Sequence, residues 1–364
     1  MKKSIMVPAT ALAAASALLL SACGEAPEES SNGGGEASDF KACMVSDSGG
    51  WDDKSFNQSG REGLDKAKED FGIEEALAES ADDSDFGPNV DNMVQQGCDL
   101  TFGVGFLLED ALQEAAEANS DMNFALIDST FSDGDGNPVE LENAKPLVFN
   151  TAEASYLAGY LAAGMSESGK VATFGGMQIP SVSIFMDGFA DGVDKYNEDK
   201  GEDVQLLGWD KEKQEGSFSG DFENQGQGQA LTEQFISQGA DIIMPVAGPV
   251  GLGAASAASK SDGTKVIWVD SDGYESAAEY KDIMLTSVMK EISTAVYDTV
   301  EAAKDGNWDA KPYVGTLENE GVGLAPYHDF EDQVDDGLKK EVEDLKQQII
   351  DGEITVESPS TPQQ

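Results

Sequence analysis

From residue 40 onward, short runs of β-forming residues alternate with stretches of helical periodicity, and this alternation restricts the fold more than any other feature. The expected strands are Ala42–Ser46, Leu100–Val104, Phe124–Ile127, Leu147–Asn150, Val171–Phe174, Ile242–Val246, Val266–Val269 and Met284–Thr286. The helical patterns between them include Asn57–Phe71, Ala154–Met165, Ile184–Tyr196, Ala230–Gln238 and Lys290–Lys304. Such alternation predicts an α/β fold of βαβ units, with parallel sheets covered by helices on both faces.

Small and acidic residues directly follow several of these expected strands. They are Asp47, Asp128, the pair Gly175-Gly176, the pair Ala247-Gly248, and Asp270. Right-handed crossovers place the C-terminal ends of parallel strands at one edge of a sheet, where ligands bind. Any one of these residues could be an ordinary turn or capping residue. Their repetition in both halves of the chain predicts two lobes that share a cleft.

The first 22 residues have the three parts of an export signal. Lys2 and Lys3 form a basic start, an apolar run covers 9–20, and Leu20-Ser21-Ala22-Cys23 resembles a bacterial lipobox, which implies a lipid on Cys23. The apolar run is too short to span roughly 30 Å of hydrocarbon as a helix. We expect a signal peptide over 1–22, the alternative being an ordinary secreted protein cut near Ala22. Residues 24–39 contain no large apolar side chain, so 23–39 should form a flexible tether.

The remaining residues are too many for one ordinary core and enough for two lobes. The chain carries 70 acidic and 22 basic residues, a formal net charge of −48. Such a field repels nucleic acid and anionic lipid, so we expect no nucleic-acid partner. It also repels itself, and salt screens that repulsion. We expect adaptation to a salty medium; the alternative is that the acidic residues only keep the surface soluble.

Two cysteines besides Cys23 stand near the starts of expected strands. Cys43 lies in the run KACMVSD, and Cys98 begins the run CDLTFGVGF. Outside the cell such a pair can form a disulfide, provided that the two strands are neighbours in a parallel sheet. Two buried free thiols fit equally well, so both alternatives stay open.

Enzymatic chemistry finds little support in the sequence. The only histidine, His328, lies in APYHDF beyond the last expected strand, so a multi-histidine zinc site is excluded. The glycines at 103–105 and 248–253 lack the spacing of a dinucleotide fingerprint, and there is no P-loop. The acidic cluster Asp133-Gly134-Asp135 fits solvated surface better than a calcium site. We expect no catalytic residue, no cofactor and no metal.

The most specific motif is DSGGWDDKSFNQ at residues 47–58. Further motifs follow in order: ALID (125–128), FN (149–150), LAGY (157–160), FGGM (174–177), GSF (216–218), AGPVGLG (247–253), VDSD (269–272), TSVMK (286–290) and GLAP (323–326). Together they resemble the basic membrane protein (BMP) family, the substrate-binding lipoproteins of ABC importers, which include purine-nucleoside receptors. The resemblance covers nearly all of residues 40–330.

The resemblance implies a type I periplasmic-binding-protein fold, with two doubly wound parallel-sheet lobes joined by a three-strand hinge. The N-terminal lobe is expected over 40–149 plus about 273–305. The C-terminal lobe is expected over 150–272 plus about 306–356, and 357–364 should be a disordered tail.

The resemblance also implies how a purine would be held. Phe56 and Phe218 match two aromatic residues that stack on opposite faces of the base. Asn57 and Asp47 match polar residues beside the base, and Asp128 matches a carboxylate that accepts hydrogen bonds from its N–H edge. Aromatic faces with a few buried acceptors at the rim suit a flat, neutral ligand on physical grounds as well.

On the ribose side, the resemblance matches Asp270 and Lys290 to the pair that holds the hydroxyls, and places Gly248 in a tight turn near the ligand. Lys290 stands at the start of an expected helix, where a cation is unfavourable, which hints at a carboxylate or ligand partner. The chain departs from the family where Pro249 replaces a second glycine, which removes an N–H donor and puts ribose-side selectivity in doubt. Trp268 is bulkier than the residue often found at its position.

We therefore expect a monomeric, lipid-anchored protein on the extracytoplasmic face of the cell membrane. It would bind a purine nucleoside (adenosine, guanosine or inosine) between its lobes and deliver it to the permease of an ABC importer. The alternatives are binding of another flat heterocycle such as a flavin, a nucleoside-processing enzyme, and a surface antigen that binds nothing small.

Overall fold

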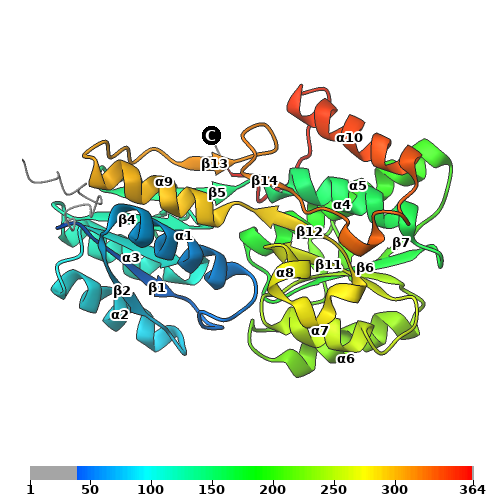
Figure 1. Cartoon of the computed structure of the whole chain (residues 1–364), viewed down its shortest axis with the longest axis horizontal. Helices are drawn as coiled ribbons and strands as arrows, with labels where there is room; N and C mark the ends of the chain where they lie inside the picture. The colour runs from blue at the N-terminus through cyan, green and yellow to red at the C-terminus, as the bar shows by residue number, and fades with distance from the viewer. Residues whose placement is uncertain (1–38, 363–364) are drawn as a thin grey trace, which may run out of the picture. The chain divides into compact units, whose positions relative to one another are not determined.

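The computed structural model describes residues 39–362, which fall within one compact unit of the chain. The expected signal peptide, Cys23 and the tether up to residue 38 lie outside the described residues. Two six-stranded sheets form the centres of two lobes (Figure 1), joined by segments that pass between them. No helix between residues 39 and 362 is long and apolar enough to cross a membrane.

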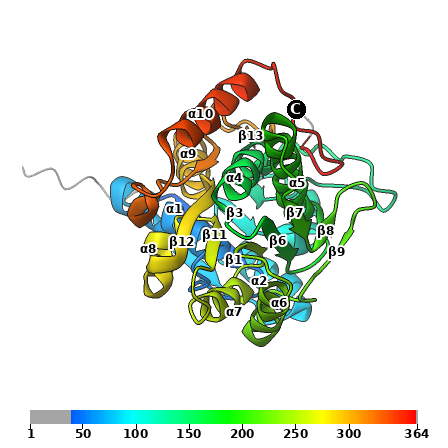
Figure 2. The same cartoon turned by 90° about the vertical axis from the view of Figure 1, so that its right-hand side faces the viewer.

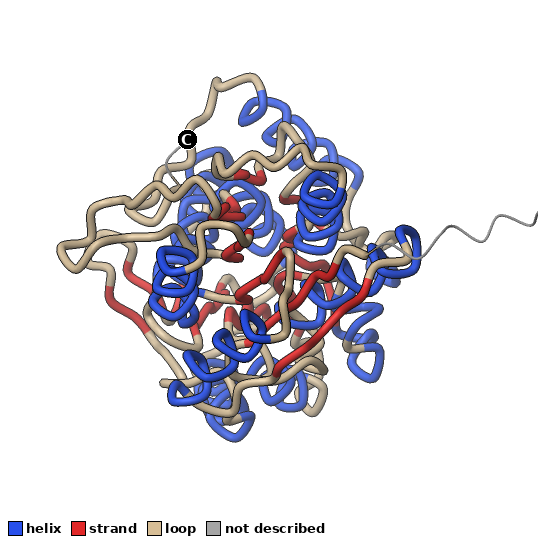
Figure 3. Tube along the Cα trace, turned by 90° about the vertical axis from the view of Figure 1, so that its left-hand side faces the viewer, coloured by secondary structure: helices blue, strands red, loops and turns tan. Residues whose placement is uncertain are grey.

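The first sheet has the strand order β13-β5-β4-β3-β1-β2, and all its neighbouring strands run parallel. The strands are β1 (Lys41–Ser46), β2 (Glu74–Ala78), β3 (Leu100–Val104), β4 (Asn123–Ile127), β5 (Ala144–Phe149) and β13 (Tyr313–Gly315). The helices of this lobe are α1 (Phe56–Phe71), α2 (Asp83–Gln95), α3 (Glu109–Ala118) and α9 (Ile292–Lys304). Helices stand on both sides of the strands (Figure 3), as a parallel sheet requires.

Side-chain alternation along β1 assigns these helices to the two faces of the sheet. Met44 belongs to the apolar cluster that contains Leu64 of α1 and Val296 of α9. Cys43 belongs to a second cluster, which contains residues of α2 and α3 such as Leu112. Successive strand residues point to opposite faces, so α1 and α9 cover one face and α2 and α3 the other.

The second sheet has the order β14-β12-β11-β10-β6-β7, parallel except for β14. Its strands are β6 (Lys170–Gly175), β7 (Gln205–Leu207), β10 (Ile242–Val246), β11 (Lys265–Asp270), β12 (Met284–Lys290) and β14 (Val322–Leu324). The helices of this lobe are α4 (Thr151–Met165), α5 (Pro180–Lys200), α6 (Gln225–Ser237), α7 (Val250–Ala258), α8 (Gly273–Ser276) and α10 (Asp336–Ile350). Figure 2 shows α4, α5 and α10 on one side of this sheet and α6 and α7 on the other. Two short strands, β8 (Trp209–Asp210) and β9 (Glu215–Gly216), form a separate ribbon.

Three segments pass between the lobes. The first joins β5 to α4, the second joins β12 to α9, and the third joins β13 to β14. Backbone hydrogen bonds tie them together: Asn150 N donates to Gly315 O at 2.8 Å, and Glu291 N donates to Gly321 O at 3.0 Å. The expected α/β fold with a three-strand hinge is confirmed.

The expected lobe boundaries near residues 273 and 306 are wrong. Strand β12 pairs with β11 in the second sheet, because the chain turns through α8 and continues as a parallel neighbour. The chain returns to the first lobe only at α9, and β13 extends the first sheet beyond residue 306. The helix expected from Lys290 begins at Ile292 instead, so Lys290 is the last residue of a strand.

The expected disordered tail is also wrong for its described part, residues 357–362. Val356 is buried, and Ser358 Oγ donates to Asp187 Oδ2 at 2.6 Å. Lys211 Nζ donates to the carbonyl of Glu357 at 2.6 Å. The segment stays in place because Asp187, fully buried in α5, needs hydrogen-bond donors.

Of the two alternatives for the cysteine pair, the structure contains the disulfide. Cys43 and Cys98 are bonded, with their Cα atoms 5.9 Å apart. Cys43 lies in β1 and Cys98 lies just before β3, and these strands are parallel neighbours. The disulfide required the starts of these two strands to be neighbours, and this condition is met.

Candidate functional site

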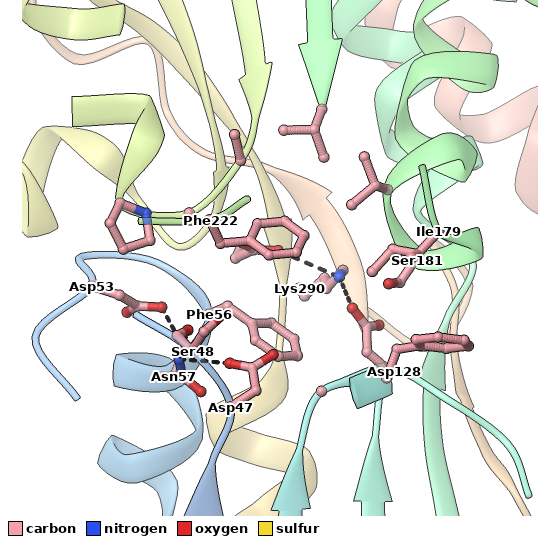
Figure 4. A pocket seen from close by; sticks show the side chains of 18 of the residues that line it. Asp47, Ser48, Asp53, Phe56, Asn57, Asp128, Ile179, Ser181, Phe222 and Lys290 are labelled. Carbon is pink, nitrogen blue, oxygen red and sulfur yellow. Dashed lines mark hydrogen bonds and ion pairs between the residues drawn. The ribbon is translucent and has the colours of Figure 1, made fainter. Parts of the chain in front are cut away.

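A cavity lies where the C-terminal ends of the two sheets meet. Seven of the eight predicted ligand-binding residues line it: Asp47, Phe56, Asn57, Asp128, Gly248, Asp270 and Lys290. They come from both lobes and from the hinge (Figure 4).

One buried lysine joins the acidic groups of the two lobes. Lys290 Nζ forms an ion pair with Asp128 from the end of β4, and its distance to Asp270 Oδ1 from the end of β11 is 3.4 Å. Burial opposes the charge on Lys290, but the two carboxylates outweigh burial and raise its pKa. Burial raises the pKa of Asp128, and Lys290 partly offsets this effect.

Asp128 and Asp270 share an unusual backbone conformation. Their φ angles are +68° and +69°, in the left-handed region that non-glycine residues rarely adopt. Each residue directly follows or ends a central strand, so this turn of the backbone directs the carboxylate into the cavity at the strand's end. Strain of this kind persists where surrounding contacts fix the residue, as at binding sites.

Asp47 and Asn57 form a second polar pair, on the first lobe. Asn57 Nδ2 donates to Asp47 Oδ1 at 2.9 Å and to the carbonyl of Ser48 at 3.2 Å. Asn57 Oδ1 is buried and accepts no hydrogen bond from any described residue. Burial raises the pKa of Asp47 well above its usual range, although the bond from Asn57 opposes this shift. The pair presents a free acceptor and a titratable group to a ligand.

Gly105 makes room for this pair. Its φ is +107°, and a methyl group in its place would lie 2.2 Å from Asp47 Oδ2. A side chain here would therefore displace the Asp47 carboxylate, so only glycine fits.

Asp53 also lines the cavity, and the sequence interpretation did not assign it a role. Its carboxylate accepts hydrogen bonds from the backbone N–H groups of Ser55 (3.0 Å), Asn57 (2.8 Å) and Gln58 (3.0 Å). It thereby satisfies orphan donors at the start of α1, as a capping residue does. Burial raises the pKa of Asp53 to about 6, although these bonds oppose the shift.

The aromatic walls differ from the prediction on one side. Phe56, the first residue of α1, lines the cavity as expected, but Phe218 does not. Phe222, four residues further along, points into the cavity from the second lobe (Figure 4). The two labelled rings, Phe56 and Phe222, therefore come from opposite lobes.

The backbone around Gly175 explains why Phe218 lies elsewhere. Phe218 forms a parallel bridge with Gly175 at the end of β6, and its ring packs edge-on against Trp209 with centroids 6.0 Å apart. The chain then turns, with Gly220 N donating to Gly176 O at 2.9 Å. A methyl group on Gly176 would lie 2.3 Å from the Phe222 ring. The glycine pair that the sequence analysis singled out thus accommodates both phenylalanines.

Gly248 and Pro249 lie in the turn after β10, and both line the cavity. Gly248 has a φ of +51°, as expected of a tight turn, and Pro249 precedes α7. Pro249 also faces the first lobe, because a methyl group on Gly49 would lie 3.1 Å from its ring. Trp268, the other departure from the family pattern, is not among the residues that line the cavity.

Besides Asp53, four further lining residues of note escaped the sequence interpretation. Phe106 follows β3 by two residues, so the strand-end argument could have found it. Ser181 and Phe185 lie in the first turns of α5, and Phe222 lies in a loop. Lys290 Nζ lies 4.8 Å from the centre of the Phe185 ring and 5.2 Å from that of Phe56, distances typical of cation–π contacts. Nothing in the sequence marks Ser181, Phe185 or Phe222 as a site residue.

The site is arranged for binding rather than for reaction. Its walls are aromatic and apolar, and its polar groups converge from two lobes that are joined by a hinge. Within residues 39–362, no group of three or more His, Cys, Asp or Glu side chains is placed to hold a metal ion. The fold and the site together define a two-lobed ligand-binding protein.

Comparison with known proteins gives the family. Residues 40–360 match the family described as ABC transporter substrate-binding protein PnrA-like. The "ABC transporter nucleoside-binding protein BmpA" of Lactococcus lactis is 32% identical, over 98% of this chain and 100% of that protein. The "CD4+ T-cell-stimulating antigen" of Listeria innocua is 31% identical, over 98% and 99%. Basic membrane protein A of Borreliella burgdorferi is 31% identical, over 87% and 88%.

Solved structures agree on the fold. An ABC transporter solute-binding protein from Aeropyrum pernix superposes with a TM-score of 0.78 at 24% identity, covering 89% of this chain and 94% of that one. One from Conexibacter woesei superposes with a TM-score of 0.66 at 21% identity, covering 88% and 99%.

The chain belongs to the PnrA-like, or basic membrane protein, family of ABC transporter substrate-binding proteins. The family consists of solute-binding proteins rather than enzymes. ABC transporter substrate-binding proteins work outside the cytoplasm, in association with a membrane and with the permease of their transporter.

Proposed function

We propose that this protein binds a neutral purine nucleoside between its lobes and delivers it to the permease of an ABC importer. The observation that carries the proposal is the pair of rings, Phe56 and Phe222, which enter one cavity from opposite lobes (Figure 4). Stacking of a base on an aromatic side chain contributes roughly 1–3 kcal/mol, and every purine offers two such faces. The name of the Lactococcus lactis relative, a nucleoside-binding protein, supports the same ligand class.

The polar rim supports a ligand rich in N–H and O–H donors. Asn57 Oδ1 and the carboxylates of Asp47, Asp128 and Asp270 are buried acceptors. A buried acceptor left unpaired costs about 1–3 kcal/mol, so these groups favour a ligand that satisfies them. A carboxylate can accept hydrogen bonds from two neighbouring hydroxyls, which suits Asp270, beside Lys290, as the ribose contact.

The charge of the cavity argues for the nucleoside over its phosphorylated form. Asp47, Asp53, Asp128 and Asp270 line it, against the single cation Lys290 among its lining residues. A phosphate would add negative charge to a buried site that already carries an excess of carboxylates.

We further propose that the protein is a monomer held at the extracytoplasmic face of the membrane by a lipid on Cys23. The lipobox motif supports this anchoring. One acyl chain anchors only marginally, so two or three chains on the same cysteine would be needed.

Titration calorimetry tests the proposed ligand. We expect saturable heat with at least one of adenosine, guanosine and inosine, no heat with free ribose, and binding of inosine 5′-monophosphate at least about 100-fold weaker than inosine. Absence of heat with every nucleoside would contradict the proposal. A yellow colour and visible absorption after purification would favour a flavin instead, and release of free base from inosine would favour a nucleoside-processing enzyme.

A further inference from the structure

The loop between β1 and α1 contacts the second lobe outside the ligand cavity. Three side chains of the second lobe donate hydrogen bonds to one atom of this loop, the carbonyl oxygen of Lys54. The donors are Trp268 Nε1 at 3.1 Å, Ser271 Oγ at 3.1 Å and Ser276 Oγ at 2.9 Å. We call these four groups the latch.

The donors are held in place by the second lobe alone. Trp268 is 1% exposed and packs in the apolar cluster that contains Ala258 and Met284. Its side chain lies close against Gly273, where a methyl group would come within 2.5 Å of the ring. A ring fixed in this way cannot turn its Nε1 to another acceptor without disturbing a packed core.

The two hydroxyls are coupled to each other and to the same acceptor. Ser271 Oγ and Ser276 Oγ lie 3.0 Å apart, so either can donate to the other when it does not donate to Lys54. A carbonyl oxygen has two lone pairs. Three donors around it therefore keep it satisfied even when one hydroxyl rotates.

The acceptor is presented by a strained residue in a well-fixed loop. Lys54 has a φ of +61°, in the left-handed region. The residues on both sides are held by hydrogen bonds. Asp53 accepts from three backbone N–H groups at the start of α1, those of Ser55, Asn57 and Gln58, and Ser55 Oγ donates to Asp270 Oδ2 across the lobes at 2.6 Å. Such strain persists only where surrounding contacts fix the residue.

The latch lies beside the ligand site but is not part of it. Lys54, Trp268 and Ser276 do not line the cavity, whereas Asp53 and Asp270, their neighbours in sequence, do. Because the acceptor belongs to the first lobe and the three donors to the second, a motion that moves the β1–α1 loop away from the second lobe breaks the latch. The latch therefore reports lobe closure without contacting the ligand.

We propose that the latch sets how much of the protein is closed, which makes Trp268, Ser271 and Ser276 positioning residues for ligand affinity and release. The proposal rests on the binding function proposed above. A bond that exists only in the closed form adds to its population, and ligand that binds this form is then held more tightly and released more slowly.

The first test needs no ligand. In a nuclear magnetic resonance spectrum of the ligand-free protein, the exchange rate of the Trp268 indole N–H with water measures how often the latch opens. We expect the double variant Ser271→Ala and Ser276→Ala to increase that rate roughly 2- to 10-fold for each bond lost. The indole of Trp308, which donates to Glu142 O within the first lobe, should keep its rate. An unchanged Trp268 rate would overturn the proposal.

The second test compares two matched tryptophan variants by stopped-flow release of inosine. Trp268→Phe keeps an aromatic ring in the core but loses the indole N–H of the latch, together with the outer ring atoms that pack against Gly251, so we expect release to accelerate roughly 2- to 10-fold while association stays the same. Trp308→Phe loses an equivalent indole-to-carbonyl bond outside the latch and should release inosine at the wild-type rate. Equal release rates for Trp268→Phe and the wild type would overturn the proposal.

The two tests separate the latch from the ligand assignment. If the wild-type protein binds no nucleoside, the proposed function fails, and the indole exchange experiment still decides the latch. If Trp268→Phe does not fold, the double variant Ser271→Ala and Ser276→Ala removes both hydroxyl donors and provides the same comparison of release rates.

Discussion

At the scale of single residues, Asp53 shows how the site couples binding geometry to protonation. Its carboxylate fixes the start of α1, and the same burial that makes these bonds possible raises its pKa to about 6. The unfolded chain would ionise near 3.8. Between pH 3.8 and about pH 6, the folded form therefore binds more protons than the unfolded form. Ionising Asp53 in the folded protein costs free energy, and this loss of stability is fully present above about pH 6.

This difference predicts that the ligand-free protein becomes more stable on mild acidification. Between about pH 7 and pH 5, the free energy of unfolding of the wild type should rise by about 1 kcal/mol more than that of Asp53→Asn, measured by urea unfolding. Asp52→Asn is the matched control, because the Asp52 side chain is 85% exposed and its variant should follow the wild type. Parallel curves for Asp53→Asn and the wild type would show that Asp53 ionises normally.

The residues of the site were predictable where a strand end or a specific motif fixes them. Asp128 and Asp270 follow from the ends of central strands, and Phe56 and Asn57 follow from the SFNQ motif. Phe222 could not be found in this way. Its loop follows a path set by contacts distant in sequence, above all by Gly176, so the choice between it and Phe218 is made by tertiary structure.

At the scale of elements, the packing of α4 against α5 positions one wall of the cavity. Three glycines allow the two backbones to touch: methyl groups at Gly159, Gly188 and Gly192 would lie 2.0–2.2 Å from carbonyl oxygens of the opposite helix. Because α5 carries Phe185 into the cavity, a change in the distance between these helices would move that wall.

Gly192→Ala should therefore lower the free energy of unfolding by about 1–3 kcal/mol, since its methyl group would meet the carbonyl oxygen of Tyr156 at 2.0 Å. Gly226→Ala is the matched control: Gly226 is also a helical glycine, in α6, but it is exposed, and a methyl group there would approach only the side-chain Oδ1 of Asn224, at 3.2 Å. That variant should be unchanged or gain up to about 1 kcal/mol from helix propensity. Equal effects in urea unfolding would contradict the close contact of the helices.

The elements themselves were largely predictable, and their assignment to lobes was not. The buried strands β1, β3, β4 and β10 contrast in sequence with their polar surroundings, and their expected bounds match within a residue or two. Strand β2, EEALA, lacks an apolar pattern, because it lies at the sheet edge and is only partly buried. Strand β12 has the sequence of a buried strand in either lobe, so only its pairing with β11 decides its place.

At the scale of the whole molecule, repulsion among the excess negative charges is the contribution to stability that solution conditions change most. Local ion pairs such as Lys66–Asp70 and Lys340–Asp344 offset part of the repulsion. Each exposed pair contributes only about 0–1 kcal/mol. With 70 acidic and 22 basic residues, most carboxylates have no basic partner, so repulsion outweighs attraction.

We therefore predict that the melting temperature rises between low salt and molar potassium chloride, because screening removes more repulsion than attraction. The rise should be similar for chloride and acetate salts, since screening depends on ionic strength. A melting temperature that stays constant or falls would show that the acidic residues serve solubility alone.

The most direct test of the account is a native mass spectrum of the protein equilibrated with equal concentrations of adenosine, guanosine, inosine, cytidine and riboflavin. We expect one adduct per chain with the mass of a purine nucleoside. The adduct should persist in Phe218→Ala and be lost in Phe222→Ala, because only Phe222 lines the cavity. A pyrimidine or flavin adduct, no adduct in the wild type, or retention in Phe222→Ala with loss in Phe218→Ala would contradict it.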